Sequence, residues 1–237
     1  MLEMALELVI SVNFAYGCKK VSPGCDNCYI ARYPFAYHTK RFGLETPFEG
    51  QVGYFDFARQ TKKAESQPKN TVIFVNALTD TFGGFIPDST RDEWHAFFRG
   101  HPEYQFMLLT KRPGKMMTYY KSRRVPDNVW VGTTVESRRF IPRIKLLKVI
   151  DANVRWVCFE PLLEDIGEVD LQGVHLISVG GESGPHARQF DPEWARNLLR
   201  VARAQGVAYS YLGARGFTDD KLDGVAYDEM PATMKLV

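Results

Sequence analysis

Short, almost continuously apolar runs rich in β-branched residues recur along the chain, and they constrain its fold more than any other feature. Seven runs are present, at residues 8–12, 72–75, 106–109, 129–131, 154–159, 176–179 and, more weakly, 207–211. A strand that is buried on both faces of a parallel sheet has this pattern, whereas a half-exposed strand alternates apolar and polar residues. The runs therefore predict a parallel sheet.

Segments with helical patterning separate these runs, at residues 26–42, 87–100, 112–121, 138–150 and 191–205. The last has Asp191 as an N-cap before Pro192, and Gly206 follows its end. Strand followed by helix, repeated six or seven times, predicts an α/β fold, either a parallel (β/α) barrel or part of one. A doubly wound open sheet is the alternative. Residues 45–70 are the least regular and are expected to form an excursion before the second strand.

Composition bounds the rest. With 237 residues, 45% hydrophobic content and a net charge of +2, residues 1–237 are expected to form a single domain. No apolar run reaches 18 residues, and the first residues include Glu3 and Glu7 and no basic stretch. We therefore expect no membrane segment and a cytoplasmic location.

Polar residues follow each apolar run, at the strand ends where parallel β/α folds collect their chemistry. Glu182 lies in a Gly-Gly-Glu-Ser-Gly stretch, whose glycines would permit close approach of a ligand. Glu160 and Asp80 could instead cap the helices that follow them. The strand-end groups expected to meet at one rim are Asn76, Asp80, Lys111, Thr134, Glu136, Ser137, Glu160, Glu182 and Ser183.

Three of the four cysteines lie within eleven residues, in GCKKVSPGCDNCY, where Cys18, Cys25 and Cys28 have the spacing C-x6-C-x2-C. A structural zinc site needs four ligands, and Cys158 or His38 could complete such a set. Cys158, however, lies inside an apolar run, where a small buried hydrophobe is expected. Three thiolates on a [4Fe-4S] cluster instead leave one iron open to a small molecule, the arrangement that binds and reduces S-adenosylmethionine. The spacing favours the cluster, with zinc as the alternative.

Six motifs occur in order: GCKKVSPGCDNCY, FVNALTDTF, LLTKRP, VWVGTTVES, FEPLL and VGGESGP-x-AR. Together they resemble a phage-associated family of three-cysteine-motif proteins related to the radical S-adenosylmethionine enzymes, over residues 13–213. The resemblance implies a partial parallel (β/α)6 barrel of radical SAM type with a cluster loop at residues 17–29. The chain departs from the usual C-x3-C-x2-C spacing of those enzymes. It also has residues 211–215, YLGAR, where relatives tend to carry a Lys-Gln-Trp type ending.

Roles follow from this resemblance as expectations. Cys18, Cys25 and Cys28 would ligate the cluster. Lys111 and Arg112 would contact an anionic group or simply begin a solvated helix. The side chains expected to bind the nucleoside cofactor are Asn76, Asp80, Thr134, Glu136, Ser137 and Ser183, and those expected to act in catalysis are Lys111, Glu160 and Glu182.

The substrate is expected to be a nucleic-acid base, an already modified thymidine in phage DNA, with an external one-electron reductant. Basic residues at 121–124 and 138–145, interleaved with Tyr119, Tyr120 and Phe140, are compatible with DNA contact, although such runs can also be solvated helix faces. The competing function is a zinc-stapled nucleic-acid or protein binding module without catalysis. A hydrolase with Asp80, Glu136 and Glu160 on a divalent metal would leave the cysteines without a role.

Overall fold

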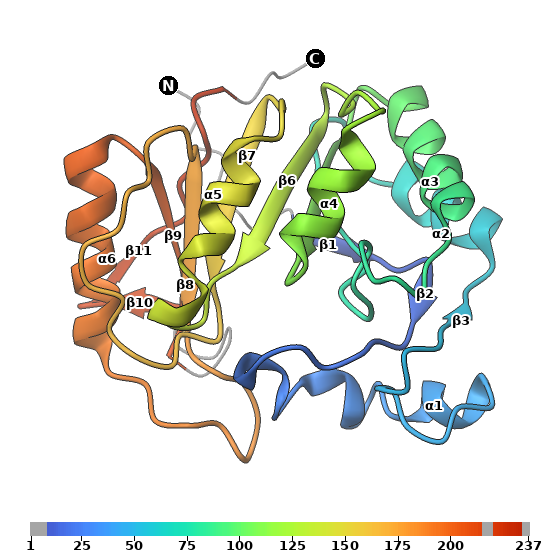
Figure 1. Ribbon diagram of the computed structural model, residues 1–237, viewed down its shortest axis with the longest axis horizontal. Coiled ribbons are helices and arrows are strands. Elements are labelled where there is room, and N and C mark those ends of the chain that lie inside the picture. Colours follow the sequence, from blue (N-terminus) through green and yellow to red (C-terminus); the bar gives the residue numbers. More distant parts are fainter. Residues whose placement is uncertain (1–8, 215–219, 234–237) are drawn as a thin grey trace.

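The computed structural model describes residues 9–214 and 220–233. Seven parallel strands form one curled sheet in the order β1-β4-β5-β6-β7-β8-β9 (Figure 1). Every predicted apolar run contributes a strand, so the prediction of a partial parallel (β/α) barrel is confirmed. The strands are β1 (Val9–Val12), β4 (Val72–Val75), β5 (Gln105–Thr110), β6 (Val129–Thr134), β7 (Val154–Phe159), β8 (Leu176–Gly180) and β9 (Ala208–Gly213).

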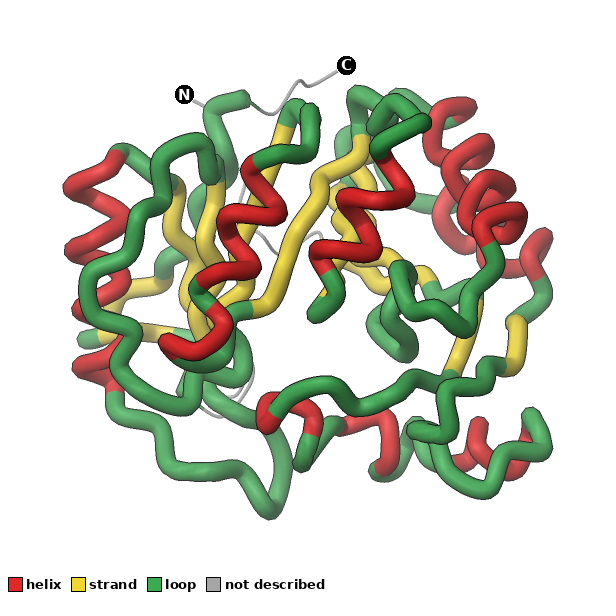
Figure 2. The backbone as a smooth tube through the Cα atoms, in the orientation of Figure 1, coloured by secondary structure: helices red, strands yellow, loops and turns green. Residues whose placement is uncertain are grey.

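The longer helices cover one face of this sheet, which excludes a doubly wound arrangement for the described residues (Figure 2). The predicted helix after Asp191 is α6 (Pro192–Gln205). Asp191 accepts a hydrogen bond from the Glu193 amide at 2.9 Å, and Gly206 ends the helix with φ 66°. The helices are α1 (Tyr37–Arg41), α2 (Phe57–Glu65), α3 (Asp88–Gly100), α4 (Pro113–Tyr120), α5 (Pro142–Lys148) and α6 (Pro192–Gln205).

Side chains alternate along each strand between the helix-covered face and the concave face. In β6, Val129 and Val131 pack under the helices, whereas Trp130 belongs to a smaller cluster on the concave face with Trp156 and Cys158 of β7. The same alternation carries the residues at the strand ends. It directs Lys111, Thr134, Glu136 and Glu160 to the concave side, at the carboxyl end of the sheet.

Two segments differ from the prediction. Residues 26–42 do not form one helix but two short turns and α1, because the backbone bonds of this segment close local turns such as Phe35 N to Arg32 O (2.7 Å). The predicted irregular excursion, residues 45–70, contains α2, whose N-cap Asp56 accepts from the Arg59 amide. It also contains β3 (Gly53–Tyr54), which pairs antiparallel with β2 (Ala15–Tyr16).

Two further features complete the fold. Residues 160–175, which connect β7 to β8, contain no helix, so the alternation of strand and helix lapses there. The short strands β10 (Lys221–Leu222) and β11 (Val225–Ala226) form a hairpin after β9. Within the described residues, every helix is too short or too polar to cross a membrane.

Candidate functional site

The cysteine segment crosses the carboxyl ends of the strands as two short 3-10 turns, η2 (Pro23–Cys25) and η3 (Tyr29–Ala31) (Figure 1). Its first cysteine is held by backbone bonds on both sides: the Cys18 amide donates to Pro47 O at 2.7 Å, and the Gly50 amide donates to Cys18 O at 2.9 Å. All three thiol-bearing residues, Cys18, Cys25 and Cys28, are half-buried. The loop is therefore an ordered cover over one end of the half-barrel.

One clamp on this loop comes from the ends of β4 and β5. The carboxylate of Asp80 accepts from the Arg112 guanidinium at 2.6 Å and from the Thr110 hydroxyl at 2.6 Å. Arg112 then donates to the backbone oxygen of Lys19 at 2.5 Å. Asp80 and Arg112 thus tie two strand ends to the cysteine loop, and Asp80 does not cap a helix, because α3 begins only at Asp88.

A second clamp comes from the loop after β8. Glu182 is buried and accepts from Asn27 at 2.8 Å and from Arg188, which also donates to Pro23 O at 2.9 Å. Burial favours a raised pKa for Glu182, but the hydrogen bonds from Arg188 and Asn27 outweigh it and lower the pKa. Neither Arg188 nor Asn27 is among the site residues predicted from the sequence. The Pro-x-Ala-Arg ending of the last motif was the available signal for Arg188.

The glycines of the loop after β8 allow other parts of the same chain to approach its backbone closely. A Cβ on Gly181 would lie 1.9 Å from the backbone oxygen of Ala214, and one on Gly184, at φ 96°, would lie 1.4 Å from the guanidinium of Arg32. The close approach expected at the glycines is therefore made by the chain and its own side chains.

Two buried oxygens at the end of β6 have no hydrogen-bond partner among the described residues: Thr134 Oγ1 and Glu136 Oε1. The other Glu136 oxygen accepts from Arg143 at 2.8 Å, and the carboxylate packs against Gly24, where an added Cβ would meet Glu136 Cγ at 3.1 Å. A buried polar atom without a partner carries a free-energy penalty. Of the two residues, Glu136 lies directly against the cysteine loop, at Gly24.

Lys111 and Glu160 bring opposite charges to the same concave face. Burial raises the pKa of Glu160 to about 7, and the nearby Lys111 ammonium limits the rise. Burial by itself would lower the pKa of Lys111, but the neighbouring Cys25, Glu136 and Cys28 outweigh it and raise that pKa. Near neutral pH the site therefore holds an ammonium beside the thiols and a carboxyl group that is partly protonated. No helix follows Glu160, so the helix-capping alternative is wrong for this residue.

The surroundings of two of the thiols favour their protonated form. Burial raises the pKa of Cys18 to about 11, with Asp80 adding to the rise, and burial also raises the pKa of Cys28. In the part of the chain that the structure describes, no three His, Cys, Asp or Glu side chains lie close enough to ligate one metal ion. A tetrahedral zinc at ~2.3 Å from each sulfur needs sulfurs within ~3.8 Å of each other. An iron-sulfur cluster instead distributes its ligands over separate irons.

The remaining predicted residues have mixed surroundings. Asn76, at φ 61°, accepts from the Phe14 amide at 2.8 Å and donates to Thr81 at 3.0 Å. Ser137 and Ser183 are half-buried at the same rim. Direct cofactor contacts by these three residues stay predictions. Of the expected terminal stretch 211–215, Arg215 lies outside the described residues.

The proposed additional zinc ligands have apolar or aromatic surroundings. Cys158 is 3% exposed within the concave apolar cluster, which confirms its interpretation as a small buried hydrophobe. His38 packs among aromatic rings, 5.2 Å from Tyr16 and 4.9 Å from Phe55 between centroids. The carboxylates invoked for a hydrolase do not converge either, since Asp80 pairs with Arg112 and Glu136 with Arg143.

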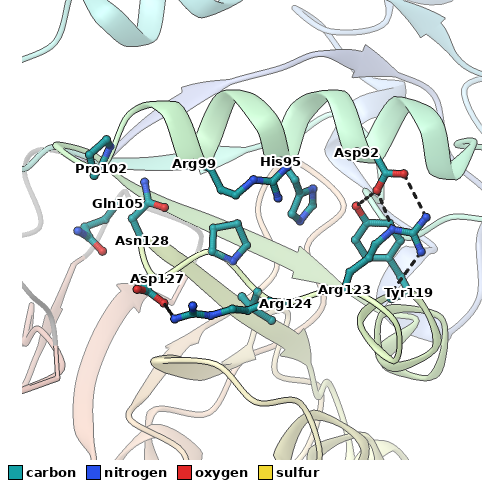
Figure 3. Close-up of a pocket in the computed structure, with 12 residues that line it drawn as sticks. Asp92, His95, Arg99, Pro102, Gln105, Tyr119, Arg123, Arg124, Asp127 and Asn128 are labelled. Carbon is teal, nitrogen blue, oxygen red and sulfur yellow. Dashed lines mark hydrogen bonds and ion pairs between the residues drawn. The ribbon is translucent and has the colours of Figure 1, made fainter.

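The two basic runs lie at opposite ends of β6. Arg123 and Arg124 precede this strand and border a cavity of about 630 Å³, where Arg123 binds Asp92 at 2.7 Å and Arg124 binds Asp127 at 2.7 Å (Figure 3). Arg138 and Arg139 follow the strand, on the side of the cysteine loop, and both are exposed. A six-residue strand separates the two pairs by ~20 Å. They therefore do not form one surface.

Comparison with known proteins supports the fold. No curated protein matches the chain significantly. Two mutant structures of spore photoproduct lyase are similar, with TM-scores of 0.57 and 0.53 at 12% and 10% identity, each over 85% of this chain and 75% of the lyase chain. At such identities the likeness shows the fold alone, a partial parallel (β/α) barrel. The family model "Protein of unknown function (DUF5131)" matches residues 9–231. The chain therefore belongs to the DUF5131 family.

Proposed function

We propose that this protein is a radical S-adenosylmethionine enzyme in which Cys18, Cys25 and Cys28 hold a [4Fe-4S] cluster. The observation that carries the proposal is one ordered loop with three thiols, clamped over the carboxyl end of a half-barrel and placed beside Lys111. Three thiolates would leave one of four irons open for the amino and carboxylate groups of the cofactor. When bound, the cluster and cofactor together supply one-electron chemistry and a 5′-deoxyadenosyl radical.

The side chains around the loop divide into positioning and binding groups. Four side chains position the loop. Arg112, Glu182 and Arg188 are hydrogen-bonded to it directly, and Asp80 holds Arg112. Lys111 offsets the negative charge of the thiolates, since its ammonium stays protonated. Binding of the cofactor's polar groups falls to Thr134 and Glu136, whose unpartnered oxygens support this role, with Asn76, Ser137 and Ser183 as further candidates.

Glu160 is the candidate acid or base. A carboxyl group with a pKa of about 7 exchanges a proton readily near neutral pH. Glu160 lies on the concave face near Lys111. Its carboxyl oxygen can hold a proton, and the Lys111 ammonium stabilises the carboxylate that remains when this proton leaves. This combination of burial and one specific charged neighbour is typical of functional sites.

The substrate we propose is a nucleic-acid base, a modified thymidine of phage DNA, which the enzyme isomerises or modifies further. The similarity of fold to spore photoproduct lyase supports a DNA-related substrate by analogy only. The exposed Arg138 and Arg139 at the rim provide positive charge for phosphates. The protein would receive its electron from an external reductant and work in the cytoplasm, where thiols stay reduced.

Anaerobic reconstitution tests the proposal. The full chain is supplied with iron and sulfide, and its iron content and visible absorption are measured. S-adenosylmethionine and dithionite are then added, and 5′-deoxyadenosine is quantified. We expect a brown protein with about four irons per chain that forms 5′-deoxyadenosine. A colourless protein that binds one zinc, takes up no cluster and releases no deoxyadenosine would instead support the zinc-stapled binding module.

A further inference from the structure

Tyrosines are exposed next to the cysteine loop. Four of the eight large hydrophobic side chains exposed in the described residues are tyrosines at positions 29 to 54, and Tyr33 and Tyr37 are 95% and 59% exposed. Phe35, which lies between these two, is half-buried and packs on a cluster that contains Tyr16 and Ile30. The segment therefore turns its phenylalanine inward and its two tyrosines to solvent.

The same segment concentrates positive charge. Residues 17–42 contain five Lys or Arg against one Asp, a net charge of +4. Because the whole chain carries +2, the remaining residues sum to −2. Lys40 and Arg41 are exposed in the last turn of α1. Exposed aromatic rings among cations match a surface for a polyanion with flat apolar groups.

This surface is fixed to the cysteine loop and to the segment that follows β4. Arg32 donates to the backbone oxygen of Asn27 at 2.9 Å, and the Tyr29 hydroxyl donates to Ala77 O at 2.5 Å. Figure 1 shows α1 at the same end of the molecule as the cysteine segment. A molecule held on Tyr33 and Tyr37 would therefore be held at the end of the half-barrel where the candidate site opens.

We propose that residues 29–41 dock single-stranded DNA, with bases stacked on Tyr33 and Tyr37 and phosphates near Lys40 and Arg41. Bases in a duplex are covered by their neighbours, so only an unstacked base can lie on an exposed ring. The single-stranded form is also the one that presents a base to an enclosed site. This inference names the form of the substrate and in that respect rests on the proposed function.

Fluorescence anisotropy tests the surface on the full chain, with and without reconstituted cluster. The probes are labelled oligodeoxythymidylate, a duplex containing it and the matching oligoribonucleotide. We expect the single-stranded DNA to bind most tightly. The double variant Y33A/Y37A should raise its Kd about tenfold or more, and Y33F/Y37F should stay within about twofold, because phenylalanine also stacks.

Salt dependence separates the charges from the rings. The variant K40A/R41A should reduce the slope of log K against log salt by about 1.4, which is ~0.7 for each cation removed, whereas Y33A/Y37A should leave it unchanged. K121A/R124A, at the far end of β6, is the matched control and should bind as the wild type does.

Tighter binding of duplex or RNA, or unchanged affinity of Y33A/Y37A, would overturn the docking surface. Deoxyadenosine formed without DNA reports on the proposed function separately. A protein that makes deoxyadenosine but fails to bind single strands refutes only this inference, and one that binds them without taking up a cluster refutes only the proposed function.

Discussion

Arg112 joins Asp80 to the backbone of Lys19, with 2.6 Å to the carboxylate and 2.5 Å to the carbonyl oxygen. One planar guanidinium thereby connects the ends of β4 and β5 to the start of the cysteine loop. A lysine at this position keeps the charge but cannot make both contacts with the same geometry.

The variant Arg112→Lys should therefore loosen the loop. We expect the free energy of unfolding to fall by about 1–2 kcal/mol and the iron bound per chain after reconstitution to fall as well. Urea denaturation and iron analysis measure the two effects. Arg124→Lys is the control, because its pair with Asp127 is exposed and contributes at most about 1 kcal/mol. Equal losses in both variants would contradict a special role for the bridge.

The cysteines should differ sharply in their effect on the cluster. Replacement of Cys18, Cys25 or Cys28 by alanine removes a ligand, so each variant should lose most of its iron and its brown colour. Cys158→Ala should retain both, because Cys158 packs in the concave apolar cluster. Iron retention in Cys18→Ala would show that the first thiol, which precedes the unusually wide gap, is not a ligand.

Glu160 should make the stability of the cluster-free protein depend on pH. Its pKa is about 7 in the folded chain and about 4.5 when unfolded. Between these values the native state keeps a proton that the unfolded state has released, so this contribution is complete below pH 4.5 and is lost as the pH rises through 7. We expect Glu160→Gln to gain about 2–3 kcal/mol over the wild type between pH 5 and 8. Glu168→Gln, at an exposed position, should show no such gain.

His95 should have the opposite dependence. Burial lowers its pKa to about 4, and its ring nitrogens lie 2.7 Å from Arg91 O and 2.6 Å from the Tyr120 hydroxyl. In the unfolded chain the imidazole of His95 binds a proton near pH 6.5, whereas in the native chain it stays neutral until about pH 4. The free energy of unfolding therefore falls as the pH falls from 6.5 toward 4. The wild type should lose about 2 kcal/mol more than His95→Gln between pH 7 and 5. Thermal unfolding at both pH values checks this, with His186→Gln as the exposed control.

Replacement of Gly24 should affect cofactor binding through the neighbouring side chain of Glu136. Its Cβ in Gly24→Ala would meet Glu136 Cγ at 3.1 Å and Cδ at 3.2 Å, so the carboxylate must move. We expect weaker binding of S-adenosylmethionine to the reconstituted protein, by about tenfold, measured by calorimetry. Gly100→Ala, with no atom within 4 Å of the added carbon, should leave the affinity unchanged. Unchanged affinity in both variants would remove Glu136 from the cofactor site.

The strands were predictable because a strand that is buried on both faces needs an apolar side chain at nearly every position of the run. The strand-end rule likewise brought Lys111, Thr134, Glu136 and Glu160 to one face. What the sequence could not reveal were the bonds that link distant segments, such as Arg188 to Pro23, since no local pattern encodes them. The composition of residues 26–42 permits a helix, whereas the tertiary contacts of the cysteine loop impose turns.

The hydrogen bonds that hold the cysteine loop join residues that are far apart in the sequence, and this affects when the loop can form during synthesis. The cysteine segment is synthesised before its partners, since Arg112 and Glu182 follow Lys19 and Asn27 by 93 and 155 positions. A ribosome must therefore extend the chain by at least 155 residues beyond Asn27 before the three thiols can take their final places. Metal loading should accordingly follow translation, and nascent chains that end before β8 should accept no stable cluster.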